Sequence, residues 1–394
     1  MPEGSKNNPS SGQAARQGSS AKGEILAHTS LRGIGAIGVM LYHFLYFYAP
    51  DGTRLSLVDI INNYGLILEL FFVNSGFIIS YMYADFYYKR VTYSSTSRFL
   101  WARFARIYPV HILALALYVG AHTAKYLLPE MNPTGPMDHF FTPPETPFAL
   151  VASVLMIHAW GITEGNSWNY VSWAVSAEFA AYLLFPLICL MIGRLKQFGL
   201  LLALASVMVI YWYMDSIFGD INVPGNYGAG RCIAGFTLGV VTYHLTPVLR
   251  HFTTSMMSAL QVVALVAILA MYGFGTSQVL VVLSVALFVF ATSENRGWVA
   301  DALTWAPLRY LGQFSFTLYM THGVAGMAAR PIIYYLGLAV GDTQSVVWSF
   351  VVVAIKSAFA LPFAYLVFKY FEMPMRDRLI QWERRRRAAT AIAK

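Results

Sequence analysis

The sequence predicts an all-α protein built as a polytopic transmembrane helical bundle. Of its 394 residues, 57% are hydrophobic and only 12% are charged, whereas a soluble domain carries about 25% charged residues. The apolar residues also gather in stretches of about 20, the length of helix that crosses a bilayer. These observations indicate an integral, multi-pass membrane protein.

Ten apolar segments are expected to span the membrane. They cover 27–49, 65–84, 107–128, 170–193, 198–218, 227–246, 255–273, 276–292, 307–336 and 346–371. The ninth is long, and Pro331 is expected to break or bend it. A further apolar segment, 148–160, is short, and we interpret it as re-entrant or interfacial, with an eleventh span as the alternative.

The basic residues orient this bundle. Loop 85–106 contains five Lys and Arg residues, while segment 129–147 contains three acidic residues and no Lys or Arg. The positive-inside rule therefore places the first loop inside, the second outside and both termini in the cytoplasm. The net charge of +8 comes largely from runs that flank apolar segments, which favours membrane topology over nucleic-acid binding.

Three regions follow from this composition. Residues 1–24 are polar and predict a disordered cytoplasmic tail, 25–378 form the transmembrane domain, and 379–394 form a basic cytoplasmic tail. The two cysteines, Cys189 and Cys232, lie in apolar segments. They form no CxxC pattern that would indicate a metal or redox site.

The first span carries the most informative pair of residues, Arg32 and His43. Eleven residues of helix return a side chain to within about 20° of its starting direction, about 16 Å further along the axis. The predicted topology places Arg32 near the inner surface and His43 near the outer one. Ionisable groups inside a membrane are usually functional. The alternative is that Arg32 snorkels to the surface and His43 is a satisfied interior histidine.

Arg103 and Arg106 lie three residues apart, so they are neighbours on a helix surface. From the cytoplasmic side, both guanidinium groups could bind phosphates. Ordinary anchoring at the inner surface is the alternative.

Polar residues in three other spans are further site candidates. Glu178 and Tyr182 share a helix face at i and i+4, and a buried ion pair between Glu178 and Arg231 is the structural alternative. Glu69 and Asn74 could line a cavity in the second span. In the ninth span, Tyr319 and His322 lie near a common face with Ser315, for which a hydrogen bond between helices is the favoured role.

No hydrolase elbow, phosphate loop or His-Glu-x-x-His metal motif occurs in the sequence, and we expect no metal site. The residues do match a known pattern in order along the chain. The matching segments are Arg-x10-His at 32–43, Phe-Phe-Val-x-Ser-Gly-Phe at 71–77, Arg-x-x-Arg-Ile-Tyr-Pro at 103–109, Trp173 to Tyr182, Leu311 to His322, and Phe-Glu-x-Pro-x-Arg at 371–376.

With these motifs the chain resembles the membrane-bound acyltransferase-3 family, which O-acylates surface glycans and related acceptors. It departs from the pattern at Ala174 and Phe316, which replace a serine and a tyrosine. The resemblance implies transfer of an acyl group, expected to be acetyl, from cytoplasmic acyl-CoA to a hydroxyl on the outer side. The acceptor would be a polysaccharide, a lipid-linked saccharide or a small glycoside, and the location a bacterial inner (plasma) membrane, with lipid as the other partner.

The expected roles divide among the residues already introduced. His43 would be the general base or a covalent nucleophile, and Glu178 would orient the imidazole or bind acceptor hydroxyls. Arg32, Arg103 and Arg106 would bind the phosphates of acyl-CoA. The remaining residues would bind substrate: Glu69, Asn74, Trp173, Tyr182, Tyr319 and His322.

Two other functions remain open from the residues alone. A transporter or flippase could use intramembrane Arg, Glu and His as a substrate or proton relay. A catalytically silent bundle could scaffold a polysaccharide-export complex. The ordered motifs favour the enzyme.

Overall fold

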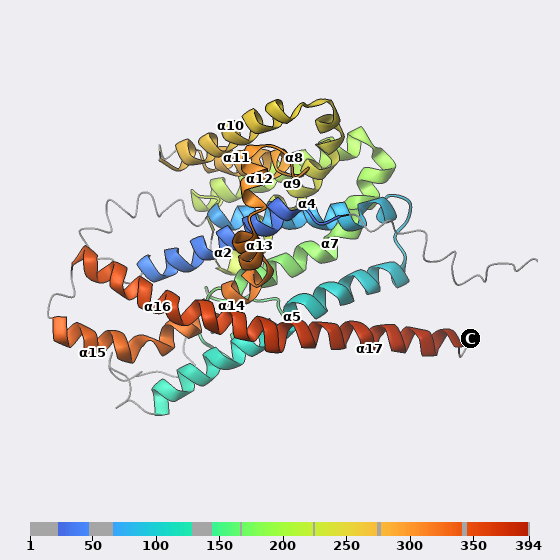
Figure 1. Ribbon diagram of the computed structural model, residues 1–394. Coiled ribbons are helices and arrows are strands. Elements are labelled where there is room, and N and C mark those ends of the chain that lie inside the picture. Colours follow the sequence, from blue (N-terminus) through green and yellow to red (C-terminus); the bar gives the residue numbers. More distant parts are fainter. Residues whose placement is uncertain are drawn as a thin grey trace, which may run out of the picture.

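The computed structural model describes residues 23–46, 66–127, 144–165, 168–223, 225–273, 277–340 and 345–392, and within these ranges every regular element is a helix (Figure 1). This confirms the all-α prediction. The α-helices are α2 (Leu26–Tyr46), α4 (Ile67–Tyr87), α5 (Tyr93–Leu127), α6 (Pro147–Val154), α7 (Trp173–Leu195), α8 (Gln197–Phe218), α9 (Gly228–Leu245), α10 (Thr254–Gly273), α11 (Gln278–Ala291), α12 (Trp298–Leu303), α13 (Ala306–Gln313), α14 (Ser315–Ala328), α15 (Arg330–Val340), α16 (Val346–Val367) and α17 (Met373–Ile392). Short 3-10 helices cover Gly225–Tyr227 (η3) and Thr246–His251 (η4), and a π-helical turn covers Phe368–Glu372 (η5).

Seven of the described helical stretches are long and apolar enough to cross a membrane. They are α4, most of α5, α7, α8, α9 with η4, most of α10, and the continuous run of α16, η5 and α17. Helix α2 has 21 residues, but its arginine, histidines and glycines lower its hydropathy. Helix α11 is apolar and has 14 residues.

The structure changes the predicted ninth span and decides between the two interpretations of segment 148–160. The predicted ninth span is three helices, α13, α14 and α15, with breaks at Phe314 and Ala329. Pro331 lies in the first turn of α15, where a backbone N–H has no partner within the helix, so its absence removes no hydrogen bond. Helix α6 has eight residues and rises about 12 Å, so segment 148–160 is not an eleventh span across about 30 Å of hydrocarbon.

The predicted boundary at residue 378 falls inside α17, which continues the helical run from α16. Trp101 of α5 donates from Nε1 to the Leu379 carbonyl at 3.1 Å, and its ring lies 5.1 Å from that of Trp382. The basic C-terminal segment is therefore a helix packed on α5. Of the predicted N-terminal tail, residues 1–22 lie outside the described residues.

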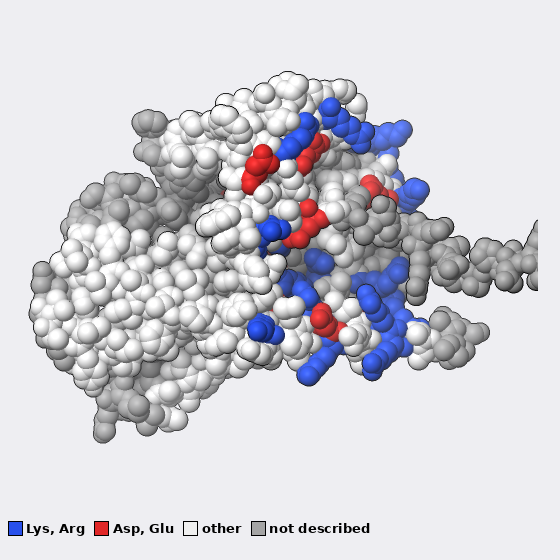
Figure 2. Space-filling view, viewed as in Figure 1, with Lys and Arg blue, Asp and Glu red and all other residues white. Residues whose placement is uncertain are grey.

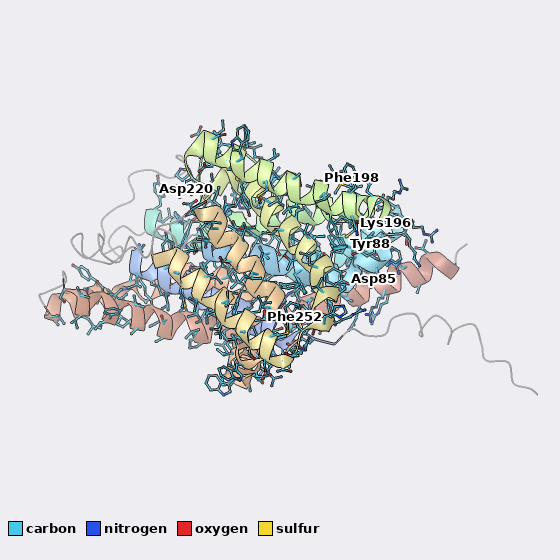
Figure 3. The ribbon with its side chains drawn as sticks, turned by 90° about the horizontal axis from the view of Figure 1, so that it is seen from above. Asp85, Tyr88, Lys196, Phe198, Asp220 and Phe252 are labelled. Atoms are coloured by element: carbon cyan, nitrogen blue, oxygen red, sulfur yellow. The ribbon has the colours of Figure 1, made fainter. Side chains whose placement is uncertain are left out.

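Charged side chains gather at one end of the bundle (Figure 2). We call this the basic end, and its exposed cations include Lys89, Arg90, Arg98, Arg194 and Lys196. Figure 3 shows Asp85, Tyr88 and Lys196 toward this end and Asp220 at the other, so α8 runs from the basic end to the opposite one.

The centre of the bundle is the close contact between α4 and α9. A Cβ atom on Gly76 would collide with the Phe236 carbonyl, and one on Gly239 would collide with the Val73 carbonyl. The absence of these side chains lets the two backbones approach closely.

A buried ion pair joins the same two helices. Nε of Arg231 on α9 donates to Glu69 on α4 at 2.6 Å, and the Tyr211 hydroxyl donates to the same carboxylate at 3.1 Å. Both charged side chains are almost completely buried. The pair therefore fixes how α4 and α9 meet.

Arg231→Met should leave the Glu69 carboxylate buried without its cation. We expect the free energy of unfolding to fall by about 3–5 kcal/mol, measured by denaturant unfolding in detergent. The double variant Glu69→Leu/Arg231→Met should recover most of this loss, because no charge then remains unpaired. Arg250→Met, at an exposed arginine on η4, is the control and should change stability by less than about 0.5 kcal/mol. Equal losses in the Arg231 and Arg250 variants would contradict the assignment.

Candidate active site

A cavity of about 130 Å³ lies among α2, α4, α5, α7 and α14, and we call it the inner cavity. These helices are distant in sequence and converge around it (Figure 1). Seven of the residues that the sequence singles out line the cavity: Arg32, Asn74, Arg103, Arg106, Glu178, Tyr182 and Tyr319.

A second cavity of about 330 Å³, the mouth, adjoins the inner cavity and shares Arg32, Ile78 and Arg103 with it. Its other lining residues include the segment from Gly23 to Thr29 at the start of α2. That segment lies near the basic end, because Ala27 N–H donates to Asn295 and the adjacent Arg296 donates to carbonyls in and beside η4. The two cavities thus lead from the basic end into the bundle.

Arg106 has a carboxylate partner inside the bundle. It forms an ion pair with Glu372 from the π-helical turn η5, and Thr317 donates a hydrogen bond to the same carboxylate. A π turn inserts one extra residue into a helix, and such turns are frequent at functional sites. Because Glu372 is almost completely buried, its charge is compensated mainly by Arg106.

Arg32 and Arg103 differ from Arg106, because their Nε–H groups are buried and have no hydrogen-bond partner among the described residues. Arg103 makes one long contact from Nη2 to the Tyr83 hydroxyl at 3.4 Å, and its guanidinium carbon lies 5.6 Å from the centre of that ring. An unmet donor on a buried charged group is costly. Both arginines line the inner cavity and the mouth, so an anion bound there would meet two guanidinium groups.

Glu178 lies on the wall of the inner cavity, where it accepts a hydrogen bond from Ser75 at 2.5 Å. The Tyr182 hydroxyl is within hydrogen-bonding reach of both residues. Glu178 also acts electrostatically on Arg32. These contacts place a carboxylate beside the arginines of the cavity.

His43 lies beyond the inner cavity and is paired with His322. Its Nδ1 is 3.0 Å from Nε2 of His322, and the Tyr170 ring meets it edge to face at 5.0 Å. Tyr319, one helical turn before His322 on α14, lines the end of the cavity next to this pair and contacts Phe71 with ring centres 6.0 Å apart. The histidine pair and the cavity arginines are therefore separate sites, with Arg32 and His43 about 16 Å apart along α2.

Besides His322, two predicted substrate-binding residues do not line the cavity. Glu69 is occupied by Arg231 and Tyr211. The Trp173 ring lies beneath the Arg231 guanidinium, 5.7 Å from its carbon. The structure thus pairs Arg231 with Glu69, whereas the sequence alternative paired it with Glu178. Glu69 and Trp173 therefore belong to the packing of α4, α7 and α9.

The sequence interpretation missed three residues that shape the cavity. Ser75 had no assigned role of its own, but its hydroxyl donates a hydrogen bond to Glu178. Phe316 lines the cavity and lies 5.7 Å from the Arg106 guanidinium carbon. Glu372 had no assigned role, although a lone carboxylate in the mostly apolar segment 366–373 was a signal for one.

Comparison with known proteins identifies the family of this chain. A family model described as an acyltransferase domain, Acyl_transf_3, matches residues 29–368. The chain belongs to this acyltransferase-3 family. The match confirms the resemblance inferred from the ordered motifs and includes every residue named above as lining the inner cavity.

Two relatives of this acyltransferase-3 protein match parts of the chain. Protein 2 in picA locus from Rhizobium radiobacter is 31% identical over 129 residues, which cover 33% of this chain and 62% of that protein. Acyltransferase MdmB from Streptomyces mycarofaciens is 29% identical over 164 residues, covering 40% of this chain and 38% of the relative. The matched regions span less than two thirds of either relative. No solved structure matches the chain.

Proposed function

We propose that this acyltransferase-3 protein is an integral membrane O-acyltransferase. It moves an acyl group, expected to be acetyl, from acyl-CoA to a hydroxyl of a glycan or glycoside acceptor. The observation that carries the proposal is the pair of adjoining, arginine-lined cavities, with Tyr319 of the inner cavity one helical turn from the His43–His322 pair. Family membership and the similarity to an acyltransferase support the same reaction class.

The gathering of Lys and Arg at one end supports the sidedness (Figure 2). Cytoplasmic loops carry the excess of these residues, so the basic end faces the cytoplasm in this proposal. A bacterial inner membrane would give acyl-CoA access to this end and the acceptor access to the other.

The donor occupies the two cavities in order. The mouth, with about 330 Å³, accommodates phosphate groups beside Arg32 and Arg103, whose free N–H groups match anionic oxygens. The inner cavity, with about 130 Å³, suits the narrow thioester end of the molecule. Arg106 is neutralised by Glu372, so it contributes less to phosphate binding. Glu24 and Glu178 both act electrostatically on Arg32.

His43 is the catalytic base in this proposal. Phe71 and Tyr319 line the cavity end next to the histidine pair, so the thioester passes these rings to reach it. His43 removes the acceptor O–H proton as the oxygen attacks the thioester carbonyl carbon. The new C–O bond forms, the C–S bond breaks, and the CoA thiolate takes the proton back from the imidazolium. A covalent acyl-His43 intermediate is the alternative route.

Acceptor-dependent release of CoA tests the function. The purified protein in detergent is mixed with acetyl-CoA and one acceptor at a time: a polysaccharide, a lipid-linked saccharide or a small glycoside. Free thiol and acylated product should appear together with the correct acceptor class. Detergent leaves no compartment for transport, so the absence of product with every acceptor, together with substrate uptake into proteoliposomes, would refute the enzyme and favour a transporter.

Replacing His43 should abolish transfer without unfolding the protein. We expect His43→Ala to lower kcat by about 10²–10⁴-fold, the usual contribution of a general base, in the CoA-release assay. His111→Gln is the control. It changes another buried histidine, whose Nε2 lies 2.8 Å from the Ser153 carbonyl, and the Gln amide can still donate there. An active His43→Ala enzyme would refute the mechanism.

Arg103→Ala should weaken donor binding, because it removes a cation with an unmet N–H at the junction of the two cavities. We expect the Kd for CoA to rise about tenfold, or about 1.4 kcal/mol, measured by isothermal titration. Arg98→Ala removes the same charge from an exposed position on the same helix and should leave the Kd within about twofold. Unchanged affinity in Arg103→Ala, or equal losses in the two variants, would refute the phosphate role.

A further inference from the structure

His322 is held by the backbone of its own helix. Its Nδ1 lies 2.8 Å from the Tyr319 carbonyl oxygen and 3.2 Å from that of Leu318. A carbonyl oxygen only accepts hydrogen bonds, so Nδ1 of His322 must carry a proton and donate it. The orientation of this ring is therefore set by α14.

The surroundings of His322 favour a neutral imidazole. The ring is completely buried, and the charged group that acts on it is the ammonium of Lys356 on α16. Burying a second positive charge there would be costly. A neutral imidazole with its proton on Nδ1 has a lone pair on Nε2, so Nε2 of His322 is an acceptor.

Nε2 of His322, as a hydrogen-bond acceptor, determines which ring nitrogen of His43 carries the proton. Nδ1 of His43 lies 3.0 Å from this Nε2, and the two rings are nearly parallel, with 14° between their planes. Two nitrogen lone pairs cannot form a hydrogen bond, so Nδ1 of His43 carries the proton and donates it to Nε2 of His322. The His43 ring also interacts with the Val39 carbonyl one turn back, where the acceptor is again an oxygen. In neutral His43, Nε2 then carries the lone pair.

We infer that His322 is a positioning residue, which holds His43 as the Nδ1–H tautomer so that Nε2 is available as the base. The inference rests on the proposed acyl transfer for its function and on geometry alone for the tautomer. Nε2 of His43 takes the proton from the hydroxyl that receives the acyl group. The resulting imidazolium keeps its Nδ1–H hydrogen bond to His322, and this bond stabilises the positive charge. In the Nε2–H tautomer, His43 would present a proton in place of a lone pair and could not act as the base.

Nitrogen NMR tests the tautomer without any assay of activity. The whole protein, labelled with ¹⁵N-histidine and placed in lipid nanodiscs, is compared with His43→Gln to assign the His43 signals. We expect a protonated Nδ1 and an unprotonated Nε2 in His43 of the wild type. In His322→Leu the His43 signals should shift toward a mixture of tautomers. A wild-type His43 protonated on Nε2 would overturn the inference.

Kinetics test what the tautomer does. In His322→Gln the amide oxygen can occupy the place of Nε2 and still accept from His43, whereas the shorter side chain of His322→Asn cannot reach it. We expect kcat to fall about 100-fold in His322→Asn and His322→Leu, the usual upper range for loss of a supporting hydrogen bond, and less than about tenfold in His322→Gln. KM for acyl-CoA should stay within about twofold, because the arginine-lined cavities are untouched.

His111→Leu is the matched control for removing a buried imidazole, and it should retain kcat because its ring contacts the Ser153 carbonyl and not His43. Equal losses in the Gln and Leu variants at His322, with folded protein in both, would overturn the inference. So would wild-type kcat in all three variants. If the wild type releases no CoA with any acceptor, the proposed function fails, while the NMR result still decides the tautomer.

Discussion

Ionisable side chains inside an apolar bundle must find partners within the protein, because lipid supplies none. This constraint divides the buried arginines of the acyltransferase-3 chain into those with a carboxylate partner and those with N–H groups unpaired within the described part of the chain. Arg231 is satisfied by Glu69 and Arg106 by Glu372. Arg32 and Arg103 keep N–H groups without partners among the described residues. The first two arginines hold helices together, and the last two are those that the proposed acyl-CoA donor would meet.

Helix α2 keeps the charged Arg32 apart from His43, the proposed catalytic base. Arg32 lies at the junction of the two cavities, and His43 lies beyond Tyr319 in contact with His322. In the proposed function, Arg32 meets phosphates near the aqueous surface, whereas His43 acts deeper in the bundle, where protein groups and not water surround the reacting atoms. One straight helix carries both groups, so the distance between them is fixed by its rise.

The break between α13 and α14 makes this arrangement possible. At Gly312 a Cβ atom would collide with the Thr29 carbonyl, so α13 lies directly against the start of α2. A new helix then begins at Ser315, and its faces direct Tyr319 to the cavity and His322 to His43. The Tyr319 hydroxyl donates to the Val171 carbonyl at 2.7 Å. This bond anchors the same helical turn whose carbonyl groups orient the His322 ring.

The sequence by itself determined the helical class, most of the long helices, the family and seven of the residues that line the inner cavity. These depend on local composition, on helical periodicity and on short ordered motifs. Only the tertiary structure decided that Arg231 pairs with Glu69, that Glu372 holds Arg106, and that His43 faces His322 outside the arginine cavity. Such pairings depend on which faces of distant helices meet, and periodicity places a residue on a face without specifying the face it contacts.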